Sequence, residues 1–143
     1  MTTTSGYSRD VCDEAYVLDA AAFFAGYQLY LARNVYTVKE VIHEVRDSAS
    51  LKNLQLALSA GRVRIIEPEA THRERVSQLA EELSILEKLS KTDLELLALT
   101  SKLLEECSRV VVISDDTAVR RVATRIGART LTIKYGRASL KRE

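Results

Sequence analysis

Carboxylates stand at two positions where predicted strands pass into helices. Asp115 and Asp116 follow Val110–Ile113, a run of β-branched residues that is typical of a strand buried on both faces. Asp19 follows a second apolar run, Ala15–Leu18, in the same way. Because ligands of open α/β sheets bind beyond the carboxyl ends of the strands, we expect both turns to lie at one edge of a sheet.

Two further acids join this set. Glu44 lies on a predicted helix beside the apolar face that Val41 and Val45 form, so we expect it to be half-buried and to need a partner. Asp93 lies in the first turn of another predicted helix. The aspartates have an alternative explanation, because Asp is a preferred helix N-cap that contributes about 1 kcal/mol. As a group they favour a cation site, since converging carboxylates repel one another and a divalent ion offsets that repulsion.

The donor atoms indicate which metal such a site would hold. Oxygen ligands alone suit Mg²⁺ or Mn²⁺. His43 and His72 have no second nitrogen or sulfur ligand at the spacing of a zinc site. With a phosphate ester as substrate, an ion of this kind would orient water and neutralise charge on the leaving oxygen.

Basic residues concentrate in the C-terminal part of the chain. The formal net charge is only +1, but the residues after Asp116 include eight Lys or Arg and a single acid. A basic segment beside an acidic site indicates a polyanionic partner whose chemistry needs a cation, and the candidates for RNA contacts are Arg120, Arg121, Arg125 and Arg137. A solvated helix face followed by a terminal tail is the alternative explanation.

Size and composition predict one globular domain. The chain has 143 residues, of which 46% are hydrophobic. No apolar run approaches the roughly 20 residues that span a bilayer, and the polar start has no signal-peptide core, so we expect a cytoplasmic protein without membrane contacts. Cys12 and Cys107 show neither a CxxC motif nor a disulfide framework, and we expect both to be free thiols.

Strands and helices alternate along the chain, which predicts right-handed crossovers and a parallel sheet. Two Thr-x-x-Glu sequences, Thr37–Glu40 and Thr92–Glu95, have the form of capping boxes at helix starts. Strands are expected at 15–18, 34–36, 62–66, 110–113 and 130–134, and helices at 20–32, from residue 37, and at 51–60, 69–89, 93–106 and 117–127.

The order Asp, Glu, Asp, Asp on an α/β frame resembles the PIN-domain nucleases. Three blocks resemble, more narrowly, the NOB endonucleases, which cleave precursor small-subunit ribosomal RNA near its mature 3′ end. These blocks are Tyr36-Thr37-x-x-Glu40-Val41-x-x-Glu44-Val45-Arg46-Asp47, Leu89-Ser90-x-Thr92-Asp93 and Ser114-Asp115-Asp116-x-Ala118-Val119.

This resemblance implies a fold and a domain organisation. The fold would be a PIN-like three-layer α/β/α sandwich with a central parallel sheet of four or five strands. The PIN domain would span residues 15–136, between a flexible N-terminal segment at 1–14 and a basic flexible tail at 137–143. The zinc ribbon into which NOB members usually continue is not found in the sequence.

The resemblance also implies the roles of the acids. The family's metal-binding positions fall on Asp19, Glu44, Asp93 and the pair Asp115 and Asp116, and the catalytic set would be Asp19, Glu44, Asp93 and Asp116. The wider PIN pattern selects Asp116 as the inner ligand of the pair. Asp115 is then a second ligand or a group that positions water.

The function implied is that of an endoribonuclease that uses Mg²⁺ or Mn²⁺ to cleave single-stranded RNA during maturation of the small-subunit rRNA 3′ end. Its partners would be precursor rRNA, ribosomal-particle proteins and a second copy in a homodimer. Two alternatives remain open at this point. One is a PIN toxin of a toxin–antitoxin pair, and the other is a catalytically silent scaffold that binds RNA and protein.

Overall fold

A five-stranded sheet forms the centre of the molecule. The computed structural model describes residues 12–31 and 34–133. The strands are β1 (Cys12–Leu18), β2 (Val35–Thr37), β3 (Val63–Ile65), β4 (Cys107–Ile113) and β5 (Arg129–Leu131). They pair in the order β3-β2-β1-β4-β5, and every pair is parallel. The predicted parallel sheet is therefore confirmed.

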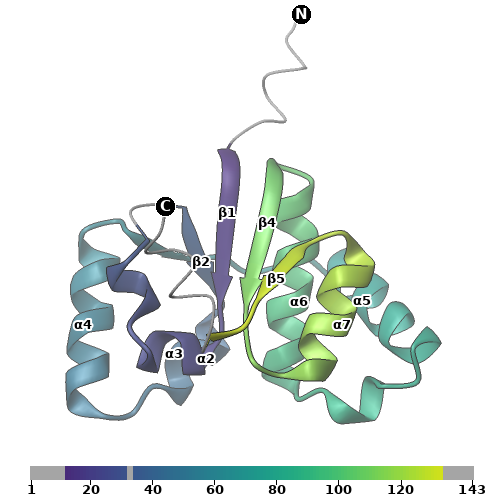
Figure 1. Cartoon of the computed structure of the whole chain (residues 1–143), viewed down its shortest axis with the longest axis horizontal. Coiled ribbons are helices and arrows are strands. Elements are labelled where there is room, and N and C mark those ends of the chain that lie inside the picture. Colours follow the sequence, from purple (N-terminus) through teal and green to yellow (C-terminus); the bar gives the residue numbers. More distant parts are fainter. Residues whose placement is uncertain (1–11, 32–33, 134–143) are drawn as a thin grey trace, which may run out of the picture.

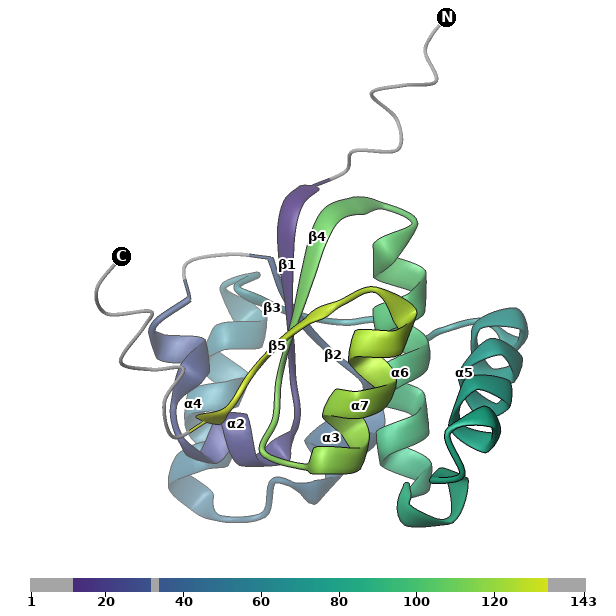
Figure 2. The ribbon, with the colours of Figure 1, turned by 45° about the vertical axis from the view of Figure 1, so that its right-hand side comes forward.

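Helices cover both faces of this sheet. They are α2 (Ala20–Phe24), α3 (Lys39–Glu44), α4 (Ser48–Ser59), α5 (Ala70–Glu82), α6 (Lys91–Leu104) and α7 (Thr117–Ile126), with short 3₁₀ helices η1 (Tyr27–Leu29) and η2 (Leu86–Lys88). Figure 1 shows α2, α3 and α4 on one side of the sheet and α5, α6 and α7 on the other, and Figure 2 shows the same division after a turn. The three-layer α/β/α sandwich is thus confirmed. None of the helices in the described ranges is long and apolar enough to cross a membrane.

The two central strands set the position of the functional edge. Leu18 of β1 is paired with Ile113 of β4, and both side chains are fully buried. From β1 the chain moves to β2 on one side, whereas β4 and β5 extend the sheet on the other side. The carboxyl ends of β1 and β4 therefore form the topological switch point, where ligands of open α/β sheets bind. Asp19 and Ser114 follow the paired residues directly and enter this edge together.

Several predicted element boundaries are wrong, and backbone geometry explains the first. The helix expected to reach residue 32 ends as α2 at Phe24, because Gly26 adopts a left-handed conformation with φ of 82° and the chain continues as η1. The long helix expected at 69–89 divides in the same manner. Ser84, with φ of 60°, separates α5 from η2.

Neither expected capping box is the one that the structure contains. Thr37 is fully buried at the end of β2, where its Oγ1 donates a hydrogen bond to the Leu18 carbonyl at 3.0 Å. The N-cap of α3 is Val38, which provides no side-chain bond. At α6 the box is shifted, because Ser90 and Asp93 exchange the two hydrogen bonds. Asp93 still lies in the first turn of its helix, as predicted.

The first strand begins earlier than predicted, and most of the two predicted terminal segments lies outside the described residues. β1 begins at Cys12, three residues before the expected start of the first strand. Residues 1–11 and 134–143 lie outside the described residues, and they contain most of the expected N-terminal segment, the whole expected tail and Arg137.

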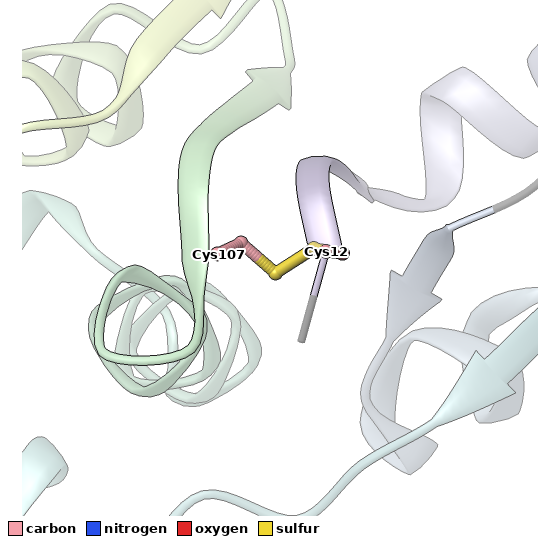
Figure 3. The surroundings of a disulfide bond; sticks show 2 residues. All are labelled: Cys12 and Cys107. Atoms are coloured by element: carbon pink, nitrogen blue, oxygen red, sulfur yellow. A yellow bond between two sulfur atoms is a disulfide. The ribbon is translucent and has the colours of Figure 1, made fainter. Parts of the chain in front are cut away.

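The expectation of two free thiols is wrong. Cys12 and Cys107 are the first residues of β1 and β4, they are register partners, and they form a disulfide across the two strands (Figure 3). Their Cα atoms are 4.7 Å apart although 95 positions separate them in the sequence. Strand pairing brings them into contact, and spacing in the sequence alone carries no sign of it. The bond lies at the amino ends of the strands, away from the switch point.

We predict that this disulfide stabilises the domain. Closing a loop of about 100 residues lowers the entropy of the unfolded chain by an amount worth about 4–5 kcal/mol at 25 °C. Cys12→Ser or Cys107→Ser should therefore shift the urea midpoint downward, and addition of a reductant should do the same to the wild type but not to either variant. Thiol titration of the unfolded, non-reduced protein should find no free cysteine. Two free thiols and an unchanged midpoint would contradict the prediction.

Candidate active site

Four of the five predicted acids line one cavity. Its volume is about 160 Å³, and its lining includes Asp19 after β1, Glu44 at the end of α3, Asp93 in α6 and Asp116 after β4. Thr92 contributes a hydroxyl-bearing side chain to the same lining. Carboxylates from four separate elements thus meet at the switch point of the sheet.

Asp19 and Asp116 are also helix N-caps. Asp19 Oδ1 accepts a hydrogen bond from the backbone N–H of Ala22 at 2.9 Å and begins α2. Asp116 Oδ1 accepts one from the backbone N–H of Val119 at 3.0 Å and begins α7. The capping explanation of these aspartates is therefore correct, but it does not exclude a second role. Each cap uses one carboxylate oxygen, and both residues line the cavity.

Asp93 is held by a reciprocal cap. Its Oδ2 accepts a hydrogen bond from the Ser90 backbone N–H at 2.9 Å, and Ser90 Oγ accepts one from the Asp93 N–H at 3.0 Å. These two bonds restrict the carboxylate to the start of α6. The capping box therefore positions Asp93 toward the edge of the sheet where the other acids lie.

Glu44 differs from the expectation. It is exposed and makes no hydrogen bond or ion pair with any residue of 12–31 or 34–133, whereas we expected a half-buried side chain with a partner. The reason is that α3 is short and ends at Glu44, so this residue is not in a helix interior. A carboxylate at a helix C-terminus faces the negative end of the helix dipole, which gives it no local stabilisation.

Asp115 lies outside the cavity lining. Its Oδ1 accepts a hydrogen bond from the Ile133 backbone N–H at 2.7 Å, which ties the turn after β4 to the chain beyond β5. Asp116, by contrast, is part of the lining. The two neighbouring aspartates therefore have different positions, because Asp116 lines the cavity and Asp115 does not. Asp116 is the residue that the sequence pattern selected as the inner ligand of the pair.

Ser114 is a site residue to which sequence reasoning gave no role. It is fully buried, and its Oγ accepts a hydrogen bond from the Asp116 backbone N–H at 3.1 Å. The same side chain hydrogen-bonds to Asp19, and this bond acts to lower the Asp19 pKa. One hydroxyl therefore links the acid after β1 to the turn after β4. Its presence in the Ser-Asp-Asp block was the available signal.

The carboxylates interact electrostatically. Burial raises the pKa of Asp19, and the negative charges of Asp93 and Asp115 raise it further, against the hydrogen bonds from Ala22 and Ser114. Burial likewise raises the pKa of Asp93, with contributions from Asp116 and Glu44. These couplings connect all the predicted acids into one group of negative charges. Binding of a cation would relieve the repulsion.

The donor set fits a hard divalent cation. Four carboxylates line the cavity, and no His or Cys is part of that lining. Such ions prefer oxygen ligands. In the described parts of the chain, however, no three His, Cys, Asp or Glu side chains are already grouped closely enough to hold an ion. The side chains would need to move inward, and Glu44, which is exposed and without a partner in those parts, is the one least restrained.

Three of the four predicted RNA-binding arginines lie on α7, where they form two groups, and Arg137 lies outside the described residues. Arg120 and Arg121 line a groove beside the helix, together with threonines. Arg125 makes an exposed ion pair with Glu82 of α5 at 3.3 Å. Arg120 and Arg121 therefore lie in the middle of α7, about one turn after its N-cap Asp116, and Arg125 lies near the end of that helix.

Fold and cavity together define the class: an open parallel α/β protein with a carboxylate site at its topological switch point. The sequence profile described as the PIN domain of ribonuclease matches residues 16–103. This range holds Asp19, Glu44 and Asp93, while Asp116 follows it. The chain belongs to the PIN-domain family of ribonucleases.

Similar proteins agree with this family. Ribonuclease VapC3 of Aeropyrum pernix is 38% identical over 122 residues, 85% of this chain and 88% of that protein. Endoribonuclease Nob1 of Pyrococcus abyssi is 35% identical over 120 residues, 84% of this chain and 69% of that protein. The crystal structure of PAE2754 from Pyrobaculum aerophilum matches with a TM-score of 0.56 at 18% identity, over 90% of this chain and 96% of that one, which shows a shared fold.

We predict that neutralising Asp19 stabilises the metal-free protein at neutral pH. A carboxyl whose folded pKa is raised contributes stability below its unfolded pKa, near 3.8, and loses that contribution as pH rises through the folded pKa. Asp19→Asn keeps the cap, because Asn is an equally good N-cap, and removes the buried charge. Its free energy of unfolding in EDTA should exceed that of the wild type at pH 7, and the difference should vanish below pH 3.8.

Asp47→Asn is the matched control. Asp47 caps α4 by accepting a hydrogen bond from the Ser50 N–H, and this bond lowers its pKa. The charged form is therefore the favoured one, and its neutralisation should not stabilise the fold at pH 7. Urea unfolding of both variants measures the difference. Equal changes in the free energy of unfolding for the two substitutions would contradict our inference that the charged form of Asp19 destabilises the metal-free fold.

Proposed function

We propose that this chain is a metal-dependent endoribonuclease that cleaves single-stranded RNA. The observation that carries the proposal is the single cavity at the switch point, lined by Asp19, Glu44, Asp93 and Asp116. PIN nucleases generally use divalent metal ions, and in this chain these four acids would hold one or two Mg²⁺ or Mn²⁺. Asp115 would act from outside the lining, through its charge on Asp19.

The chain's own groups have distinct tasks in this proposal. Asp19 and Asp93 are held in place by backbone hydrogen bonds and would provide fixed ligands. Glu44 is unrestrained and would close on the site when it is loaded, or receive the proton of the attacking water. The bound metal would supply Lewis-acid stabilisation of the charge that develops on the phosphate. Basic residues of the C-terminal part, namely Arg120, Arg121, Arg125 and Arg137, would contact the RNA backbone.

The proposed substrate is precursor small-subunit ribosomal RNA near its mature 3′ end. This finer assignment is supported by the similarity to several proteins named endoribonuclease Nob1 and to the yeast protein named 20S-pre-rRNA D-site endonuclease, which is 33% identical over 93 residues. Ribosomal-particle proteins and a second copy of the chain belong to the same proposal as partners.

A PIN toxin of a toxin–antitoxin pair is the second candidate function. The similarity to the ribonuclease VapC3 of Aeropyrum pernix, which extends over 88% of that protein, favours it. The acid cavity would perform the same chemistry in both cases, so the two functions differ in the RNA that is cut and in the protein partner. A catalytically silent scaffold would need no such cavity.

A cytoplasmic location is part of the proposal. It is consistent with the absence of a membrane-spanning helix among the described residues and with RNA as the substrate. The Cys12–Cys107 bond is unusual for that compartment, because cytosolic disulfides are rare outside hyperthermophiles. The pair is buried, with exposed fractions of 8% and 7%, which limits access by reductants.

We predict that Asp19→Asn and Asp116→Asn each lower the cleavage rate about 100-fold or more, because each removes a carboxylate that would hold the ion on which stabilisation of the phosphate charge depends. Both variants keep their helix caps, since Asn is also a good N-cap. Single-turnover cleavage in Mn²⁺ measures the effect, and circular dichroism verifies the fold. Lys91→Ala, an exposed substitution at the start of α6, serves as a control that should retain the wild-type rate. Full activity of either Asn variant would show that the substituted residue is not needed for cleavage, which would contradict its assignment to the active site.

Two RNAs distinguish the candidate functions in the same assay. One spans a precursor small-subunit rRNA 3′ end, and the other is unrelated and equally unstructured. Cutting confined to the rRNA junction supports the maturation function. Equal cutting of both supports a PIN ribonuclease whose specificity resides in a partner, and absence of cutting in every divalent metal supports the scaffold.

We predict that Mn²⁺ stabilises the wild type and that EDTA abolishes cleavage. A ligand that binds only the folded state at about 100 times its dissociation constant adds about 2.7 kcal/mol to stability. The thermal midpoint of the wild type should therefore rise with Mn²⁺ concentration. Asp93→Asn should lose most of this rise. An equal rise in wild type and variant would indicate that the ion binds elsewhere.

A further inference from the structure

A second hollow runs along α7 next to the acid cavity. Its volume is about 410 Å³. We call it the α7 groove, and its lining consists of Thr117, Arg120, Arg121 and Thr124 of α7, Thr130 of β5, and Leu83 at the end of α5. The acids of the candidate active site have no part in this lining.

The linings of the two hollows contain neighbouring residues at the start of one helix. Asp116 lines the acid cavity and is the N-cap of α7, while Thr117, the next residue, is the first of the helix and lines the groove. The groove lining therefore begins one residue away from an acid of the cavity, within reach of a polymer whose scissile phosphate lies among the acids.

The chemistry of the groove suits a phosphate–sugar backbone. Two guanidinium groups and three threonine hydroxyls line it, and no carboxylate does. These groups commonly contact nucleic-acid phosphates and sugars. The Arg120 Nε is buried and has no hydrogen-bond partner in the described part of the chain. Arg121 is exposed and forms no ion pair there, whereas Arg125, outside the groove, is paired with Glu82.

The volumes of the two hollows suit ligands of different size. Pockets for small organic ligands range from roughly 300 to 1,000 Å³, and the α7 groove falls in that range. The acid cavity, at about 160 Å³, falls below it and matches metal ions, water and a single phosphate better than a whole nucleotide.

We propose that the α7 groove is a binding subsite for unpaired RNA on one side of the scissile phosphate. Arg120 and Arg121 hold backbone phosphates, and Thr117, Thr124 and Thr130 add hydroxyl contacts. This inference rests on the proposed function. It extends that function by making the footprint one-sided, so that nucleotides on one side of the cut matter more for binding than nucleotides on the other.

Binding tests the groove separately from cleavage. We would measure the affinity of a fluorescently labelled, unstructured 12-nucleotide RNA by anisotropy in EDTA, where cleavage does not interfere. Arg120→Ala/Arg121→Ala should bind about tenfold more weakly or worse, because it loses two charged contacts. The slope of log K against log salt should fall by about 1.4, that is, about 0.7 for each phosphate contact with a single strand.

Control variants distinguish RNA binding by the groove residues from a general effect of removing positive charge. Arg64→Ala removes an exposed arginine from β3, at the opposite edge of the sheet, and should bind as the wild type does. Thr124→Val should weaken binding and leave the salt slope unchanged. The double variant could fail to fold, so Arg121→Ala is measured alone as well. Because Arg121 is exposed, this single variant should fold normally, and its loss of RNA affinity should lie between those of the wild type and the double variant. Equal affinity of the double variant and Arg64→Ala would overturn the subsite.

Cleavage of truncated RNAs tests the one-sided footprint. Substrates shortened from the 5′ end or the 3′ end toward the cut should lose rate strongly in one series only, and the double variant should lose this asymmetry. Equal losses in the two series would overturn the one-sided arrangement. If the wild type cleaves nothing but still binds RNA through Arg120 and Arg121, the proposed nuclease function fails and the groove remains an RNA site.

Discussion

The parallel pairing of β1 with β4 is the constraint on which the rest of the structure depends. It aligns Leu18 with Ile113, so Asp19 and Ser114 leave the sheet at the same level. The buried Ser114 hydroxyl then connects Asp19 to the turn that holds Asp116. At the opposite end of the same pair of strands, the disulfide of Cys12 restricts how far the strands can separate. Strand pairing therefore sets the level at which the acids after β1 and β4 enter this edge.

Like charges at this edge oppose folding, and local hydrogen bonds counteract that effect. Asp19 and Asp93 each accept a backbone N–H at the start of a helix, and these bonds act to lower the pKa values of the two carboxyls against the effect of burial. Helix capping and ligand binding are thus compatible roles of one side chain, since a carboxylate has two oxygens. Glu44 has no such bond in the described part of the chain and keeps its freedom to move.

Two helices on the same face of the sheet carry the remaining parts of the site. Helix α6 brings Asp93, and its position against α5 is secured by Arg73, which forms two hydrogen bonds of 2.7 and 3.1 Å with the buried Glu95. Helix α7 joins the acid cavity to the α7 groove through Asp116 and Thr117. Asp116 of the acid cavity and the arginines of the α7 groove therefore belong to one helix and its N-cap, which sets their relative position.

The sequence by itself determined the alternation of strands and helices, the parallel sheet and the acids after β1 and β4, because burial and periodicity are written in local residue types. It did not determine where helices stop, since Gly26 and Ser84 break them through left-handed backbone. Only the tertiary structure decided the Cys12–Cys107 bond, the exposure of Glu44 and the separation of Asp115 from Asp116. The disulfide and the bond between Asp115 and the Ile133 N–H depend on which distant segments become neighbours, and the exposure of Glu44 depends on where α3 ends. A linear pattern of residue types does not contain that information.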